Sequence, residues 1–118
     1  MTIDKTEFGS ITIDGKTFEH DVVIGLSGGV RKRRKKLSKA EYGTSHILSK
    51  AEAKDVFEDG CELLVIGAGQ DGRLSLSPEA EAYFEKKSCR VVTKPTPDAV
   101  AEFNAARGRK IGLMHVTC

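Results

Sequence analysis

The stretch Cys61-Glu62-Leu63-Leu64-Val65-Ile66-Gly67 decides the fold class of this chain. It is an apolar run of the length of one strand, and a glycine ends it. Two further strand-like segments follow, Arg90–Thr93 and Lys110–Val116. Nearly continuous apolar strands are typical of a parallel sheet that is covered on both faces. We therefore predict that these three strands run parallel in one central sheet.

Helical segments separate these strands. Ser77-Pro78 and Thr96-Pro97-Asp98 are helix-opening patterns, because the first turn of a helix does not need the backbone donor that proline lacks. A third helix precedes the first of the strands. Its start, Ser49-Lys50-Ala51-Glu52, is a capping box, in which serine and glutamate each satisfy a free backbone donor. The second half thus contains a β-α-β-α-β unit, whose crossovers are almost always right-handed.

The first third of the chain indicates antiparallel β-structure. Residues 10–13 alternate in polarity ahead of Asp14-Gly15, a hairpin signal, and residues 17–24 continue in the extended state. A second turn, Ser27-Gly28-Gly29, leads into a third strand that begins at Val30. We predict a three-stranded meander that covers one face of the central sheet, with the helices on the other face.

Length and composition agree with one folded domain. A chain of 118 residues with 39% hydrophobic and 31% charged residues is typical of a soluble globular protein. We expect a single α/β domain over residues 1–118 with three layers: an N-terminal antiparallel β meander, a central mostly parallel sheet, and helices. No apolar run approaches the ~18 residues of a membrane-spanning helix, and Met1–Lys5 does not begin an export or mitochondrial signal. We therefore expect a cytoplasmic location and no membrane partner.

The strongest compositional signal is a basic segment. Residues 31–39 (RKRRKKLSK) hold seven of the 19 Lys and Arg, which leaves 12 bases against 17 acids elsewhere. Side chains alternate between the faces of a strand, so we expect neither face of the part from Arg31 to Lys36 to be buried. We predict that it binds an acidic protein or another anionic partner. The residues of this predicted binding segment are Arg31, Lys32, Arg33, Arg34, Lys35 and Lys36.

Two alternatives remain for the same segment. It could bind nucleic acid, although it contains no aromatic residue on which a base could stack. It could also be a solvated edge strand whose charges prevent aggregation, a role that needs no ligand.

A glycine-rich loop follows the central strand. Gly67-Ala68-Gly69-Gln70-Asp71-Gly72 matches the spacing of a dinucleotide-binding loop. However, the next helix begins only at Ser77, and the following strand ends in Thr93-Lys94 rather than in an acidic residue. We therefore expect no nucleotide cofactor. The glycines permit a tightly packed exit from the strand, or else their amides form a nest for another anion.

The carboxyl ends of the parallel strands are the second candidate site. Ligands of open α/β sheets bind at these ends, which selects Gly67, Gly69, Lys94, His115 and Cys118 as neighbours. His46, in a loop rich in hydroxyl groups, could add a general base or a metal ligand.

Catalysis, ligand binding and a purely structural role are all open for this group, in which His46, His115 and Cys118 are the catalytic candidates. The chain has no familiar catalytic motif, so enzymatic activity is not our expectation. Its three cysteines, Cys61, Cys89 and Cys118, lack the spacing of a zinc site, so we expect reduced thiols and no structural metal.

The order and spacing of short motifs resemble a known family of small single-domain proteins, the MTH-nine-three-eight-like family. The resemblance spans nearly the whole chain and implies a three-layer fold with a parallel and an antiparallel sheet. It implies no activity, substrate or cofactor. Its mitochondrial members include an assembly factor for respiratory complex I, which suggests an assembly-type role. The matching motifs are Phe8-Gly9, Ile13-Asp14-Gly15, His20–Ile24, Ser27-Gly28-Gly29, Gly43–His46, Leu64–Gly69, Thr96-Pro97, Glu102-Phe103-Asn104 and His115–Cys118.

Overall fold

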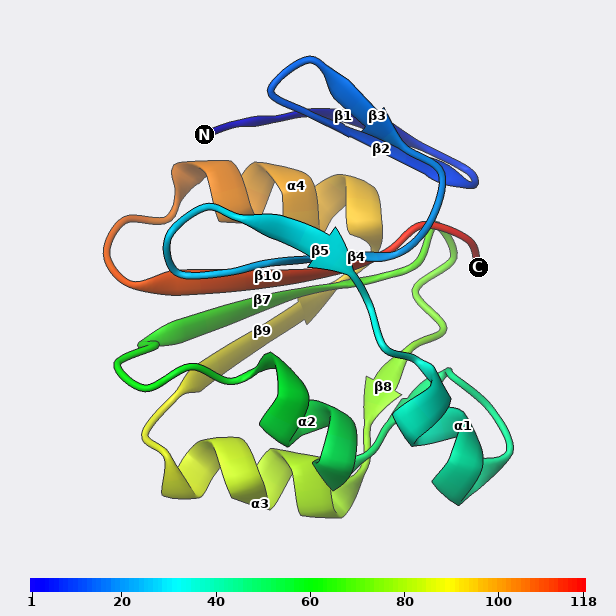
Figure 1. Cartoon of the computed structure of the whole chain (residues 1–118), viewed down its shortest axis with the longest axis vertical. Coiled ribbons are helices and arrows are strands. Elements are labelled where there is room, and N and C mark those ends of the chain that lie inside the picture. Colours follow the sequence, from blue (N-terminus) through cyan, green and yellow to red (C-terminus); the bar gives the residue numbers. More distant parts are fainter.

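The computed structural model describes all 118 residues and places the strand β7 (Leu63–Ala68) between two parallel neighbours in the main sheet (Figure 1). β7 runs parallel to β10 (Lys110–His115) on one side and to β9 (Arg90–Lys94) on the other. Two short antiparallel strands, β4 (Val22–Ile24) and β5 (Val30–Lys32), extend the sheet beyond β10 in the order β5-β4-β10-β7-β9. The predicted α/β fold class and its three parallel strands are confirmed.

Helices cover both faces of this sheet, rather than one face as we predicted. α2 (Lys50–Val56) and α3 (Pro78–Lys86) pack on one face, and α4 (Thr96–Ala105) packs on the other (Figure 1). The reason lies in the strand order. The chain moves from β7 outward to β9 and then back across β7 to β10. Right-handed crossovers in opposite directions place their helices on opposite faces.

The N-terminal sheet differs from the predicted meander in the strands that form it, because β4 and β5 belong to the main sheet instead. β1 (Ile3–Glu7), β2 (Ser10–Ile13) and β3 (Lys16–Phe18) form an antiparallel meander that packs with α4 over the main sheet (Figure 1). The hairpin at Asp14-Gly15 is confirmed, but the predicted strand over residues 17–24 breaks after β3. All three residues of β4 are buried, so this segment gains more apolar contact inside the main sheet than in a meander with one exposed face.

The basic segment also differs from its prediction. β5 ends at Lys32, and a short helix, α1 (Lys36–Tyr42), follows, whereas we expected the strand to continue through the basic residues. Gly43 ends α1 in the left-handed conformation, with φ of 72°. Two short strands, β6 (Ile47–Leu48) and β8 (Ser75–Leu76), pair in parallel near α1 and α2.

Two serines cap the predicted helices. The side chain of Ser49 accepts a hydrogen bond from the Glu52 amide, and that of Ser77 accepts one from the Ala80 amide. The other half of the predicted capping box is absent, because the Ser49 amide donates to the Ser38 hydroxyl instead. The Glu52 carboxylate is therefore free for another partner. None of the four helices has the length and apolarity that crossing a bilayer requires.

Candidate functional site

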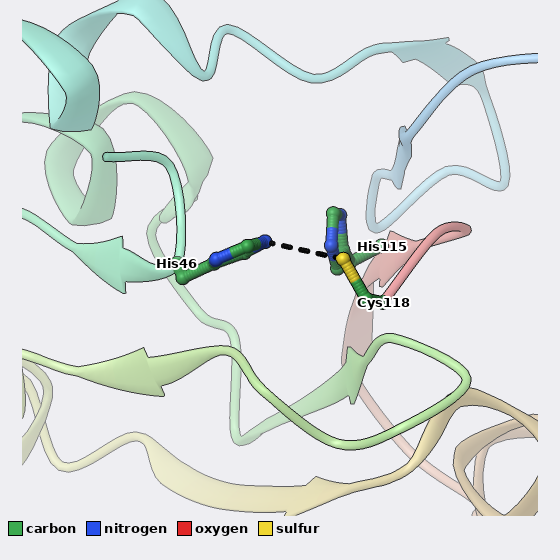
Figure 2. A group of neighbouring side chains, drawn as sticks. All are labelled: His46, His115 and Cys118. Atoms are coloured by element: carbon green, nitrogen blue, oxygen red, sulfur yellow. Dashed lines mark hydrogen bonds between the residues drawn. The ribbon is translucent and has the colours of Figure 1, made fainter. Parts of the chain in front are cut away.

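Three of the predicted residues meet where the parallel strands end (Figure 2). His115 is the last residue of β10, Cys118 lies three residues beyond it, and His46 comes from the loop before β6. The Cys118 Sγ lies 3.8 Å from the His46 Nε2, and the two imidazole rings meet edge to face with centroids 5.3 Å apart. His115 is buried, whereas His46 and Cys118 are partly exposed. A thiol and two imidazoles thus share one small, partly accessible site.

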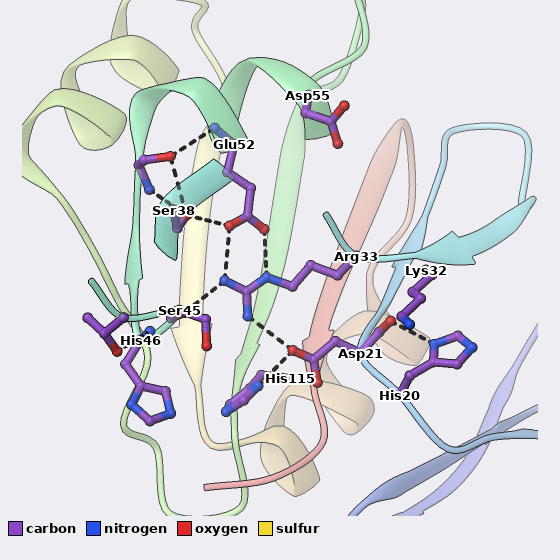
Figure 3. Close-up of polar contacts among 12 residues, drawn as sticks. His20, Asp21, Lys32, Arg33, Ser38, Ser45, His46, Glu52, Asp55 and His115 are labelled. Carbon is purple, nitrogen blue, oxygen red and sulfur yellow. Dashed lines mark hydrogen bonds and ion pairs between the residues drawn. The ribbon is translucent and has the colours of Figure 1, made fainter. Parts of the chain in front are cut away.

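A buried carboxylate holds His115 in place. The Asp21 Oδ2 lies 2.8 Å from the His115 Nδ1, and the Asp21 Oδ1 accepts the Val116 amide at 2.9 Å (Figure 3). The carboxylate can only accept, so Nδ1 carries the imidazole proton. The second ring nitrogen, Nε2, is then an acceptor, and the Thr117 hydroxyl lies 3.3 Å from it.

Behind Asp21 lies Arg33, the residue that departs most from our prediction. We expected every side chain of residues 31–36 in solvent, but Arg33 is 3% exposed. Its guanidinium binds Glu52 through two hydrogen bonds, at 2.6 and 3.0 Å, and Asp21 through a third at 3.0 Å. A fourth goes to the Ser45 carbonyl at 2.8 Å. The run leaves β5 at this point, so the strand argument for exposure does not apply to Arg33.

Glu52 completes this buried charge network, which we define as Asp21, Arg33, Glu52 and His115 (Figure 3). The side chain of Glu52 is fully buried, and the Ser38 hydroxyl also donates to it. Two carboxylates therefore face one guanidinium. Neither Asp21 nor Glu52 was predicted as a functional residue. Asp21 lies 12 residues and Glu52 19 residues from Arg33 in the sequence, so no local pattern indicates that they bind it.

The network changes the acidity of its members. Burial alone would raise the pKa of Asp21, but hydrogen bonds from His115 and Val116 and the charge of Arg33 hold that pKa below its ordinary value. Burial would likewise lower the pKa of Arg33, and its bonds to Glu52 and Asp21 raise it instead. Burial and the nearby His115 and Arg33 lower the pKa of His46. His46 is therefore a neutral imidazole over a wider pH range than a free histidine.

The glycine-rich loop holds the end of the chain rather than presenting its amides outward. The Gln70 amide donates to the Thr117 carbonyl at 2.6 Å, and the Arg73 amide donates to the Cys118 carbonyl at 3.2 Å. Gly69 donates to the Thr96 hydroxyl at 2.9 Å. These amides are engaged within the protein, which favours the tightly packed strand exit over the anion nest.

Gly67 and Gly69 are required for that packing. A Cβ on Gly67 would lie 2.8 Å from the Met114 sulfur, and one on Gly69 would overlap the carbonyl group of Cys118. Gly69 also has φ of +98°, where a side chain is strained. Gly69 therefore borders the site and positions Cys118, whereas Gly67 permits close packing against Met114 and Thr96 on the α4 face.

Lys94 does not join the cluster. Its ammonium group binds the carboxylate of Glu102 on α4 at 2.7 Å and is exposed. α4 covers the face of the sheet opposite to α2 and α3, whereas His115 lies on the same face of β10 as Ile111 and Leu113, the α2 and α3 face. The expectation that ligands bind at strand ends placed Lys94 at the correct end of the sheet, where it pairs with Gly67. It could not show on which face of the sheet the Lys94 side chain lies.

The basic segment separates into two kinds of residue. All three arginines are paired within the protein: Arg33 with Asp21 and Glu52, and both Arg31 and Arg34 with Asp55. The lysines form no ion pair and are exposed. We call them the lysine surface, and they are Lys32, Lys35, Lys36 and Lys39.

Comparison with known proteins gives this geometry a family context. The family described as "Protein of unknown function (DUF498/DUF598)" matches residues 3–114. The chain is 38% identical to the conserved hypothetical protein PH1505 from Pyrococcus horikoshii, whose crystal structure superposes with a TM-score of 0.92 over 100% of both chains. It is 31% identical to a protein named MT938, with a TM-score of 0.83 over 99% of this chain and 98% of the other.

A more distant relative shows the same fold. A protein from Bordetella pertussis, described as a Mth938-like domain, is 16% identical, with a TM-score of 0.70 over 98% of this chain and 85% of that one. The family resemblance inferred from the sequence motifs is thus confirmed. None of these descriptions assigns a reaction or a partner.

Proposed function

Because this chain belongs to the DUF498/DUF598 family of Mth938-like proteins, whose function is unknown, we propose its role from its own surface: a non-catalytic binding module for an acidic protein segment. The lysine surface is the proposed binding site. One observation carries the proposal: within residues 31–39 each arginine forms an ion pair within the protein, whereas the lysines form none and are exposed.

The arrangement of the lysines supports an anionic partner. Lys36 and Lys39 are three residues apart on α1, and Lys35 and Lys39 are four apart, so their ammonium groups share one side of the helix. The first turn of α1 contains no acidic residue to offset them. Like charges at this spacing destabilise a helix by about 0.2–0.5 kcal/mol per pair. An acidic partner would relieve this repulsion.

The shape of the surface favours an extended acidic segment over a small anion. Lys32 lies on β5, an edge strand that pairs only with β4, whereas the other three lysines lie at the start of α1 and along it. A shallow hollow lined by residues 31–37 lies between them. Several carboxylates along one segment can each meet a different lysine here, and the open edge of β5 offers backbone groups as well.

The test is a fluorescence-anisotropy titration with a labelled peptide of alternating Glu and Ser. Each exposed ion pair contributes about 0.2–1 kcal/mol, so four pairs together should change affinity by at least about fourfold. We expect saturable binding that weakens with salt. The variant with Lys32, Lys35, Lys36 and Lys39 all changed to Glu should lose it.

A matched control separates a specific surface from net charge. Changing the exposed lysines Lys50, Lys54, Lys86 and Lys87, on α2 and at the end of α3, to Glu alters the net charge equally at another place. This control should bind the peptide as well as the wild type does. Equal weakening by both variants would contradict the proposal, and so would tighter binding of a DNA duplex than of the acidic peptide.

A further inference from the structure

A second site rests on a different observation, the meeting of His46, His115 and Cys118 at the strand ends (Figure 2). One donor atom from each residue, two imidazole nitrogens and one sulfur, lies within 4.8 Å of the others. In a tetrahedral zinc site, with metal–nitrogen bonds of about 2.0 Å and metal–sulfur bonds of about 2.3 Å, nitrogen and sulfur donors lie about 3.3–3.5 Å apart. The His46 Nε2 and the Cys118 Sγ, 3.8 Å apart, need to approach by only a few tenths of an ångström to reach this spacing.

The surroundings of His115 prepare this side chain to bind a metal ion. Asp21 accepts a hydrogen bond from the Nδ1–H group of His115, so the lone pair of the His115 Nε2, near Thr117 and Cys118, is the one that can bind a metal ion. A carboxylate that binds the second nitrogen of a histidine is the usual support of a metal-ligating imidazole, because it fixes the ring and raises its basicity. Here the Arg33 guanidinium in turn fixes Asp21, so the ligand has a rigid support.

The charges behind His115 also favour a cation. The buried charge network contains two carboxylates and one guanidinium, which leaves one negative charge without a partner apart from His115. A positive charge bound on the other side of the His115 ring, at its Nε2, would compensate this negative charge. A bound metal ion would supply that charge, and the Cys118 thiolate would supply a further negative charge to the ion.

The loop around Gly69 keeps the third donor in place. Hydrogen bonds from the Gln70 and Arg73 amides hold the carbonyls of Thr117 and Cys118. The terminal segment is thereby restrained on both sides of the Cys118 side chain. His46 comes from a loop whose position is fixed at one side by the bond from Arg33 to the Ser45 carbonyl.

We propose that His46, His115 and Cys118 bind a divalent transition metal of the zinc type, with three protein ligands and a fourth position open to water or to a small ligand. Two imidazoles and a thiolate are donors for zinc or cobalt, whereas calcium and magnesium prefer oxygen. Binding breaks the S–H bond of Cys118, its proton passes to the solvent, and the sulfur forms a bond to the metal without any change of oxidation state.

The other cysteines offer no competing site. Cys61 and Cys89 are buried as free thiols with their sulfurs 3.7 Å apart, and no histidine joins them in a cluster of metal-ligating groups. Burial, with the neighbouring Cys61, raises the pKa of Cys89 to about 12. Their thiolate forms are therefore scarce at neutral pH.

The experiment is a titration of the reduced, metal-free protein with Co²⁺, followed by displacement with Zn²⁺. We expect one Co²⁺ per chain, the visible absorption of a tetrahedral ion, and a thiolate-to-cobalt charge-transfer band that Zn²⁺ removes. Cys118→Ser should abolish the charge-transfer band, and His46→Gln should weaken binding by at least about tenfold. Both residues are partly exposed, so both variants should fold, which thermal melting verifies.

His20→Gln is the matched control. His20 is the third histidine of the chain and contacts the Asp21 carbonyl, but it does not belong to the cluster. It should bind Co²⁺ as the wild type does. Absence of stoichiometric binding would overturn the proposal, as would a charge-transfer band that survives in Cys118→Ser or an affinity that His46→Gln leaves unchanged. None of these outcomes affects the lysine surface, so the two proposals are tested independently.

Discussion

Residues 31–39 form one basic run in the sequence, and the structure divides it into an inner and an outer half with different chemistry. The inner half is Arg33, whose planar guanidinium binds two carboxylates and a carbonyl inside the protein. The outer half is the lysine surface, whose ammonium groups face solvent without ion pairs. Arginine suits fixed, multidentate bonding, and lysine remains a mobile, hydrated point charge. The difference teaches that Arg33 serves the stability of the fold and that the lysines of this run are the groups available to a partner.

The largest effect is expected from removing the inner charge. Arg33→Met leaves Asp21 and Glu52 buried without a counter-charge and should destabilise the fold by about 3–5 kcal/mol, measured by urea unfolding. Lys32→Met, at the adjacent position, should change stability by less than about 0.5 kcal/mol. Similar losses in both variants would show that the run is not divided in this way.

The next effect concerns Asp21. Asp21→Asn removes the charge from three hydrogen bonds and should cost about 1–3 kcal/mol at neutral pH. Because folding lowers the pKa of Asp21, its contribution is present above the ordinary aspartate pKa and is lost as the pH falls through the lower folded value.

The pH dependence separates Asp21 from the other acids. Metal-free wild-type protein should therefore lose stability more steeply with acid than Asp21→Asn does, as thermal melting below about pH 4 can show. Parallel acid profiles would contradict the role assigned to this carboxylate.

Gly69 provides a third test of the inner region. Gly69→Ala combines a strained φ with a clash against Cys118 and should destabilise the protein by about 1–3 kcal/mol. Gly15→Ala is the control, since Gly15 has a similar φ of +81° and nothing within 4 Å of the added Cβ. The excess loss in Gly69→Ala, with a weaker Co²⁺ charge-transfer band, would measure how closely the loop holds the site.

The smallest effect on stability is expected at the outer half. Changing all four residues of the lysine surface to Ala removes no ion pair and relieves like-charge repulsion on α1. The free energy of unfolding should stay within about 0.5 kcal/mol of the wild type or rise slightly. A large loss in urea unfolding would mean that these lysines are structural after all.

The sequence predicted those parts of the molecule that local patterns determine. The three parallel strands, the serine caps at Ser49 and Ser77, and the neighbourhood of His115 and Cys118 all follow from periodicity and topology. The break between β3 and β4 and the helix α1 were missed, because tertiary burial outweighs local propensity there. Arg33 was missed for a related reason, since its carboxylate partners are distant in sequence.

The same limit applies to the strand-end cluster. His46 and Cys118 are 72 residues apart, so no spacing motif could reveal their contact. The strand-end rule brought His115 and Cys118 together, and only the fold shows that Asp21 supports one of them.

The most direct measurement of the central claim is a residue-resolved NMR titration of the ¹⁵N-labelled protein with the acidic peptide. The account predicts that the largest amide shifts lie in β5 and α1, around the lysine surface, and that they diminish with salt. Shifts centred on His46, His115 and Cys118, or spread evenly over all lysines of the chain, would contradict it.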